Sequence, residues 1–257
     1  IFEYLTQLAE QPPDVATMIL DAIPTESTNP HLMTLLSMFA QGEDSAVAAH
    51  AMDRLGAMRT PQAAGCLTAL SETLPPALAS AATRSVRKLR MRGVAFEPEP
   101  TSAGWRALLS PVDGTGSQVV WFVRVRPEDK HGILISVLTK DPLGIVGCFG
   151  STDVPVSELP KSQPLGSIFR LTRKDEEAAI MLLEVPFDVG RQALREATEL
   201  NGASGIRPPL EYRLLGSLIW TVASDDAMLP EEDTAQEASA EDAGAALLDH
   251  PAFADWY

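Results

Sequence analysis

The chain has 257 residues, of which 45% are hydrophobic, and carries a net charge of −15. No run approaches the roughly 20 apolar residues that a membrane-spanning helix needs. The only two cysteines, Cys66 and Cys148, are too few for a disulfide framework. We therefore expect a soluble protein of the reducing cytoplasm with no membrane partner. The chain begins with Ile1 rather than Met, so its start does not exclude a preceding segment.

The charge is distributed unevenly along the chain. Residues 1–53 hold eight acids and no Lys or Arg, residues 54–213 hold all 20 basic residues and 17 acids, and residues 214–257 hold ten acids and no Lys or Arg. The net charges of these segments are −8, +3 and −10. Either the acidic ends are solvated surfaces that favour solubility, or the C-terminal part binds a basic partner or the chain's own basic centre.

Helical periodicity dominates the first 93 residues. We expect helices over 3–9 and 13–23, the second with Asp14 as its N-cap, and four more that begin at Asn29-Pro30, Asp44, Thr60-Pro61 and Pro75-Pro76. Asn, Asp and Thr are favoured N-cap residues, and proline suits the first helical position. Because the connections are short, consecutive helices should form antiparallel hairpins.

A weak internal repeat runs through these helices. Ala51 and Leu55 recur 31 positions later as Ala82 and Val86. A period of roughly 30 to 45 residues with paired helices is typical of α-solenoids. The run "DSAVAAHAMDRLG", with Asp44, Val47, Ala51, Leu55 and Gly56, resembles short HEAT repeats of the phycobilisome-lyase type, and Thr60-Pro61 and Leu67 continue the pattern. The resemblance covers about residues 30–93 and implies a stacked helical scaffold without any activity.

Strand-like patterns replace helical ones after Gly93. The runs "WRALLSPV" and "SQVVWFVRVR" flank "DGTG", and Asp113-Gly114 between two β-rich runs predicts a hairpin. Val119, Trp121, Val123 and Val125 alternate with the other residues of their strand and should share one face. With "HGILISVLTK" and "GIVGCFGS" as further strands, the pattern predicts an antiparallel meander.

The remaining sequence mixes helical and strand signals. We expect a short helix over 153–162 capped by Asp153, a loop at "KSQPLGS", a helix or strand at "RKDEEAAIMLLEV", a helix from Pro186 to Gly202, and a short helix followed by a strand in "PPLEYRLLGSLIW". The fold class is therefore α+β: HEAT-like α-solenoid hairpins, then an antiparallel-sheet α+β domain. The expected parts are a helical domain over 1–93, an α+β domain over 104–222, and an acidic linker with a C-terminal docking segment over 223–257.

Signals for catalysis and for cofactors are missing. None of the four histidines shares a metal-ligand spacing with another, and no CxxC or HExxH occurs. "DGTGSQ" is followed by a strand rather than by the helix N-terminus of a phosphate loop. Cys148 and His131 could form a nucleophilic pair only if the fold brought them together. We expect no catalytic residue, no metal and no cofactor.

Two segments are candidates for partner binding. Arg84, Arg87, Lys88 and Arg92 lie in a basic run of a predicted helix, either as solvated cations near a helix C-terminus or as a patch for an anionic partner. Phe253, Trp256 and Tyr257 follow the acidic segment, either packed on the chain's own body or as a docking peptide. The net charge of −15 and the lack of aromatics in the basic run disfavour nucleic acid.

The composite expectation is a non-catalytic protein-interaction or scaffolding protein, with a protein partner that is basic if the acidic tail binds it. One alternative is an enzyme or a small-ligand domain in residues 104–222. A third is an accessory protein of a nucleic-acid machine that uses the basic helix at 84–92. A pocket with converging polar groups in residues 104–222 would favour the enzyme or small-ligand alternative, and a continuous basic stripe would favour the nucleic-acid alternative.

Overall fold

The computed structural model describes residues 7–8, 11–27, 29–100, 104–126, 128–172 and 179–223. It combines helices with one antiparallel sheet, as an α+β chain should, and divides into two units. The helical unit comprises the chain up to Pro100 together with Gly205–Ala223, and the described residues of the sheet unit lie within Thr101–Ser204. The expected α+β domain over 104–222 thus differs from the observed division, since its last helix belongs to the helical unit.

Local capping explains where most helices begin. The helical unit contains α2 (Pro13–Ala22), α3 (Pro30–Ala40), α4 (Ser45–Ala57), α5 (Pro61–Thr73), α6 (Pro76–Met91) and α8 (Leu210–Trp220). The side chains of Asn29, Asp44 and Thr60 accept hydrogen bonds from backbone N–H groups of the first turns of α3, α4 and α5. The expected N-cap at Asp14 is wrong, because α2 begins one residue earlier, after Pro12.

The helices pack in two layers around one apolar core. Neighbour contacts join α2, α4 and α6 in one layer and α3, α5 and α8 in the other. Ala51, Leu55 and Ala82, three of the four repeat positions, are fully buried, and Val86 packs against the same core. Consecutive helices therefore form the expected hairpins.

Helix α8 belongs to the helical unit, although it follows all six strands in the sequence. Leu210 and Leu214 pack against the helical core. Directly after α8, Val222 pairs with Glu99 in a parallel bridge, and the N–H of Ala223 donates to the carbonyl of Glu99 at 2.7 Å. The expected strand at the end of "PPLEYRLLGSLIW" is wrong, because those residues continue the helix to Trp220.

The sheet unit is built on six antiparallel strands. They are β1 (Trp105–Leu109), β2 (Ser117–Arg124), β3 (His131–Lys140), β4 (Gly144–Pro155), β5 (Ile168–Thr172) and β6 (Ala179–Val185), in the order β4-β3-β2-β1-β6-β5. The predicted meander is confirmed as β1 to β4. The β1–β2 hairpin turns at Asp113–Gly116, where the Asp113 carboxylate accepts hydrogen bonds from Thr115 and Ser117 and Gly116 has a φ of +78°.

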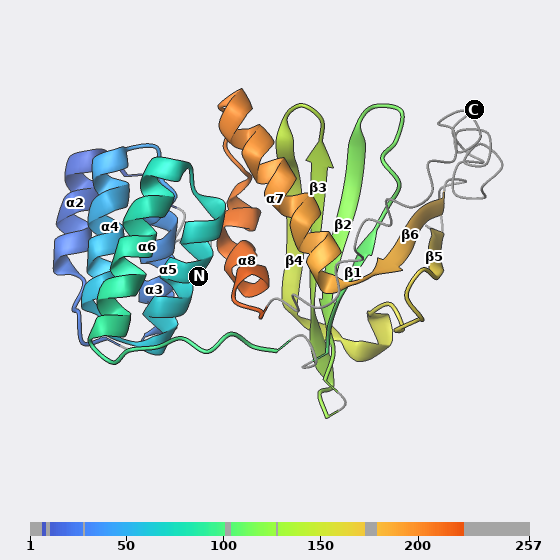
Figure 1. The fold of residues 1–257 in the computed structure, drawn as a ribbon, viewed down its shortest axis with the longest axis horizontal. Coiled ribbons are helices and arrows are strands. Elements are labelled where there is room, and N and C mark those ends of the chain that lie inside the picture. Colours follow the sequence, from blue (N-terminus) through green and yellow to red (C-terminus); the bar gives the residue numbers. More distant parts are fainter. Residues whose placement is uncertain are drawn as a thin grey trace, which may run out of the picture. The chain divides into compact units, whose positions relative to one another are not determined.

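One face of the sheet is covered by α7 (Phe187–Ser204), which runs across β1 to β4 (Figure 1). Phe187 packs edge-on against Phe122 at 5.3 Å between ring centroids. Gly190 lies so close to the sheet that a Cβ there would stand 2.7 Å from Cβ of Ala107. At the other end of α7, buried Asn201 bonds to the backbone of Leu143 and Ile145.

Two expected elements of the sheet unit differ from the structure, and one alternative is confirmed. Residues 153–155 continue β4, and a 3-10 turn follows at Val156–Glu158 in place of the expected helix. The apolar end of "RKDEEAAIMLLEV" is strand β6, as the strand alternative predicted, and residues 173–178 lie outside the described residues. Ile168–Thr172, for which no element was expected, forms β5. Helix α7 continues past Gly202 and stops before Gly205, whose φ is +70°.

Candidate interaction surfaces

The sheet has a second face, opposite α7, which we call the outer face. Pairing of β2 with β3 and of β3 with β4 sets Trp121, Ser136 and Phe149 in one row and Val119, Leu138 and Gly147 in the next. Paired residues of neighbouring strands point to the same side of a sheet. One apolar cluster contains all four residues of the predicted face, Val119, Trp121, Val123 and Val125, which confirms the prediction from their alternation.

The outer face remains open over part of its area. Phe149 is 59% exposed, Leu138 38% and Ile180 48%, although all three lie within strands. Trp121 and Val119 beside them are half-buried. Leu138 and Phe149 lie on the neighbouring strands β3 and β4, whereas Ile180 lies on β6, beyond β2 and β1. Apolar side chains exposed on one face are a recurrent mark of binding surfaces. Sequence reasoning missed Leu138, Phe149 and Ile180, although apolar residues on both faces of β3 and β6 were the available signal.

The other end of the outer face is closed by the segment after β4. Leu159 packs on Leu108, Val123 and Leu182. Beneath this segment the Arg106 guanidinium binds both carboxylate oxygens of Glu184, at 3.0 and 2.8 Å, and donates to the carbonyl of Pro160. Both partners are largely buried, so the pair fixes the closing segment to β1 and β6. The sequence carried no signal for this pair.

The basic run forms a stripe on α6. Arg84, Arg87, Lys88 and Arg92, which we call the basic stripe, are all exposed, and Arg90 beside them is exposed as well. The opposite side of α6 is buried through Ala82, Ser85 and Leu89. Met91 lies between the cations and is 82% exposed. The stripe is therefore continuous, and it contains no aromatic side chain on which a base could stack.

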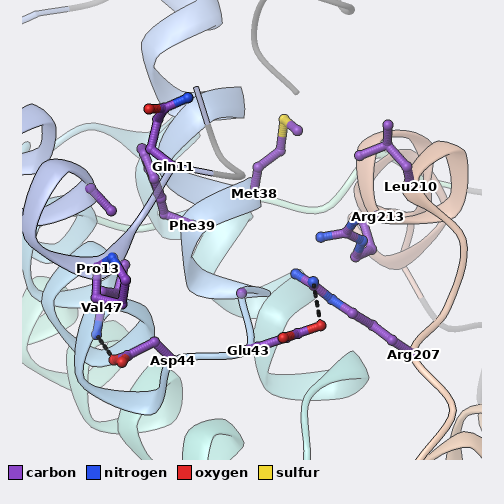
Figure 2. Close-up of a pocket in the computed structure, with 12 residues that line it drawn as sticks. Gln11, Pro13, Met38, Phe39, Glu43, Asp44, Val47, Arg207, Leu210 and Arg213 are labelled. Atoms are coloured by element: carbon purple, nitrogen blue, oxygen red, sulfur yellow. Dashed lines mark hydrogen bonds and ion pairs between the residues drawn. The ribbon is translucent and has the colours of Figure 1, made fainter. Parts of the chain in front are cut away.

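A pocket of about 620 Å³ opens in the helical unit (Figure 2). Apolar Met38, Phe39 and Leu210 line it together with four charged residues, Glu43, Asp44, Arg207 and Arg213. The Arg207 guanidinium lies 3.7 Å from Oε1 of Glu43 and donates to the carbonyl of Gln41. The Asp44 carboxylate caps α4 by accepting from the N–H groups of Ala46 and Val47. Glu43 and Arg207 therefore pair with each other, and the Asp44 carboxylate is used by the N-terminus of α4.

A second pocket of about 400 Å³ lies between α3, α5 and α8 and includes Cys66. Burial raises the pKa of the Cys66 thiol to about 11. The thiolate, which is the nucleophilic form, is therefore scarce at neutral pH. Cys66 acts here as a small apolar side chain.

The structure separates the remaining candidates for chemistry. Cys148 pairs with Val137 and His131 with Pro155 on the β3–β4 ladder, so Cys148 and His131 lie about 20 Å apart at roughly 3.3 Å per residue. Nδ1 of His131 lies 3.4 Å from Oδ1 of Asp153, and Nε2 of His50 lies 3.0 Å from Oδ1 of Asp21. Within the described residues, no three His, Cys, Asp or Glu side chains gather as metal ligands. Among the described helices, none has the length and apolar character to span a membrane.

The C-terminal candidates Phe253, Trp256 and Tyr257, and the whole of residues 224–257, lie outside the described residues. Comparison of the chain with family models, curated proteins and solved structures found no match. The surfaces described above therefore carry the functional argument by themselves.

Proposed function

We propose that this chain is a non-catalytic protein-recognition module whose outer sheet face binds an apolar segment of a protein partner. The supporting observation is the exposure of Phe149, Leu138 and Ile180 on a face whose central residues form an apolar cluster. Burying a large apolar side chain gains about 1.5–3 kcal/mol. Three such side chains can therefore support specific binding.

We further propose that the helical unit is a HEAT-like scaffold. Its two layers of helices and the buried repeat positions Ala51, Leu55 and Ala82 support this proposal. Stacked helical pairs are recognition scaffolds in which each pair packs only on its neighbours.

The proposal is tested by selecting binders from a phage-displayed random peptide library with the full chain. Enriched peptides should contain several apolar or aromatic residues. Their affinity should fall at least about tenfold for a Leu138→Ser, Phe149→Ser double variant, since each tenfold corresponds to about 1.4 kcal/mol. Met18→Ser is the matched control, because Met18 is an exposed apolar residue of the helical unit.

Two results would count against recognition through this face. One is a set of peptides that bind the double variant as tightly as the parent chain. The other is an equal loss of affinity in the Met18→Ser control. Both would place the binding surface elsewhere on the chain.

A further inference from the structure

We propose that the acidic segment 224–243 binds the basic stripe of α6 within the same molecule, which makes the stripe a docking site for an acidic peptide. The proposal concerns the helical unit and is independent of recognition through the outer sheet face.

The first support is the state of the stripe itself. Within the part of the chain that the structure describes, the side chains of Arg84, Arg87, Lys88, Arg90 and Arg92 make no hydrogen bond and no ion pair. Like charges three and four residues apart on a helix repel one another. An acidic ligand would relieve this repulsion, and Met91, next to Arg92 at the C-terminal end of the stripe, offers it an apolar contact.

The second support is the point from which the acidic segment starts. Ala223 bonds to Glu99, which follows Arg92 by seven residues. Seven extended residues span at most about 25 Å, so Glu99 and its partner Ala223 lie within about that distance of Arg92. The 20 residues that follow Ala223 span up to about 70 Å when extended, which is enough to reach the whole stripe. Two groups of one chain meet at a higher effective concentration than separate molecules, which favours weak ion pairs within one molecule.

The third support is charge complementarity. Residues 224–243 contain eight acids and no Lys or Arg, with Glu231, Glu232 and Asp233 consecutive. The basic stripe and Arg90 contribute five positive charges in nine residues. The net charge of −15 repels a nucleic acid that approaches from solution. The acidic segment belongs to the same chain, so its binding requires no such approach.

Zero-length carbodiimide cross-linking of the full chain tests this contact. The reagent joins a lysine ammonium to a carboxylate in contact with it, and Lys88 is the only lysine of the helical unit. Mass spectrometry should find Lys88 joined to acids of 224–243, roughly fivefold more often than Lys130, Lys140 or Lys161 of the sheet unit, given the high local concentration. The yield should fall between 0.1 M and 1 M salt, because the screening length shortens from about 10 to about 3 Å.

Two matched variants test whether the stripe residues themselves, rather than the net charge of the chain, hold the acidic segment. Arg84→Gln, Arg87→Gln and Arg92→Gln together keep Lys88 as the reporter and should lower its cross-linking to 224–243 at least threefold. Arg59→Gln, Lys161→Gln and Arg170→Gln change the net charge equally at exposed positions off the stripe and should leave the yield unchanged. Equal yields in both variants would overturn the proposal.

Three further results would also overturn it. If Lys88 is cross-linked to 224–243 no more often than the lysines of the sheet unit are, the proposed contact does not form. A yield that rises with protein concentration would assign the stripe to a second copy of the chain. Loss of the cross-link on adding a micromolar single-stranded oligonucleotide at 0.15 M salt would assign it to nucleic acid.

Discussion

The helical unit and the sheet unit bury their apolar residues differently. Each of the helices α4, α5 and α6 buries one stripe, and the exposed side of α6 carries charge. The sheet is apolar on both faces, but one helix covers only one of them. A helix with a single apolar stripe can bury that stripe and keep a polar surface. A strand that is apolar on both faces buries its side chains only when both faces are covered. Among the residues that the structure describes, none covers the part of the outer face around Phe149.

This contrast assigns different chemistry to the two units. The surface of α6 offers electrostatic contacts, which are long in range and sensitive to salt. The outer face of the sheet offers apolar contacts, which respond little to salt. Raising the salt concentration should therefore weaken binding to α6 and leave binding to the outer face almost unchanged, which distinguishes the two kinds of partner.

The largest expected effect lies under the closed end of the outer face. Glu184→Ala leaves the buried Arg106 without its carboxylate, and loss of one partner of a buried ion pair costs about 3–5 kcal/mol. Urea denaturation with hydrogen exchange followed in β1 and β6 should show this loss. A double variant, Arg106→Met with Glu184→Leu, should recover most of it, and no recovery would mean that the pair does more than satisfy two buried charges.

The helical core should respond through packing alone. Leu55→Ala removes a fully buried side chain between the helix layers, which should cost about 2–5 kcal/mol. Met18→Ala, at an exposed position of the same unit, should change stability by less than about 0.5 kcal/mol. The denaturation midpoint of the helical unit measures both, and an unchanged midpoint for Leu55→Ala would refute the repeat core.

Two glycines compare the covered and the outer face of the sheet directly. Gly190→Ala forces a Cβ to 2.7 Å from Ala107 beneath α7, and overpacking of this kind costs about 1–3 kcal/mol. Gly147→Ala places a Cβ 3.3 Å from Cβ of Leu138 on the outer face, a contact that a shift of a few tenths of an ångström in the edge strand β4 relieves, so its effect should stay below about 0.5 kcal/mol. Equal costs, measured by chemical denaturation, would mean that the two faces are equally packed.

The smallest expected effect is the pH dependence of the β1–β2 turn. Hydrogen bonds from the Thr115 hydroxyl and from the N–H groups of Ser117 and Thr115 lower the pKa of Asp113. A lowered pKa in the folded state gives stability that is present above the unfolded pKa of about 3.9 and is lost as pH falls through the folded pKa. Asp113→Asn should therefore be less stable than the parent at pH 7, with the difference shrinking in acid. A difference independent of pH would contradict this.

Features decided by neighbouring residues could be predicted from the sequence. The caps at Asn29, Asp44 and Thr60 and the hairpin after Asp113 depend on side chains within a few positions. The basic stripe follows from helical spacing alone. Such local hydrogen bonds and periodicities are visible in sequence because their partners are adjacent.

Features decided by distant contacts could not be predicted. No element was expected for the five residues of β5, which form a strand through their pairing with β6. The apolar end of α8 suggested a strand, yet it is helical because Leu210 and Leu214 pack on the helical core. Apolar alternation in β3 showed that Leu138 lies on an apolar face. It could not show that this side chain stays exposed, because exposure depends on what the rest of the fold leaves uncovered.

The central claim is that the outer face contacts a protein partner in the cell. A photo-cross-linking amino acid placed at Phe149 in the full chain, with Met18 as the matched exposed position, tests it in the cells that make the protein. We predict one discrete heavier adduct from position 149 that persists when the cell extract is brought to 1 M salt before irradiation, and none from position 18. Identical adducts from both positions, or none from position 149, would contradict the claim.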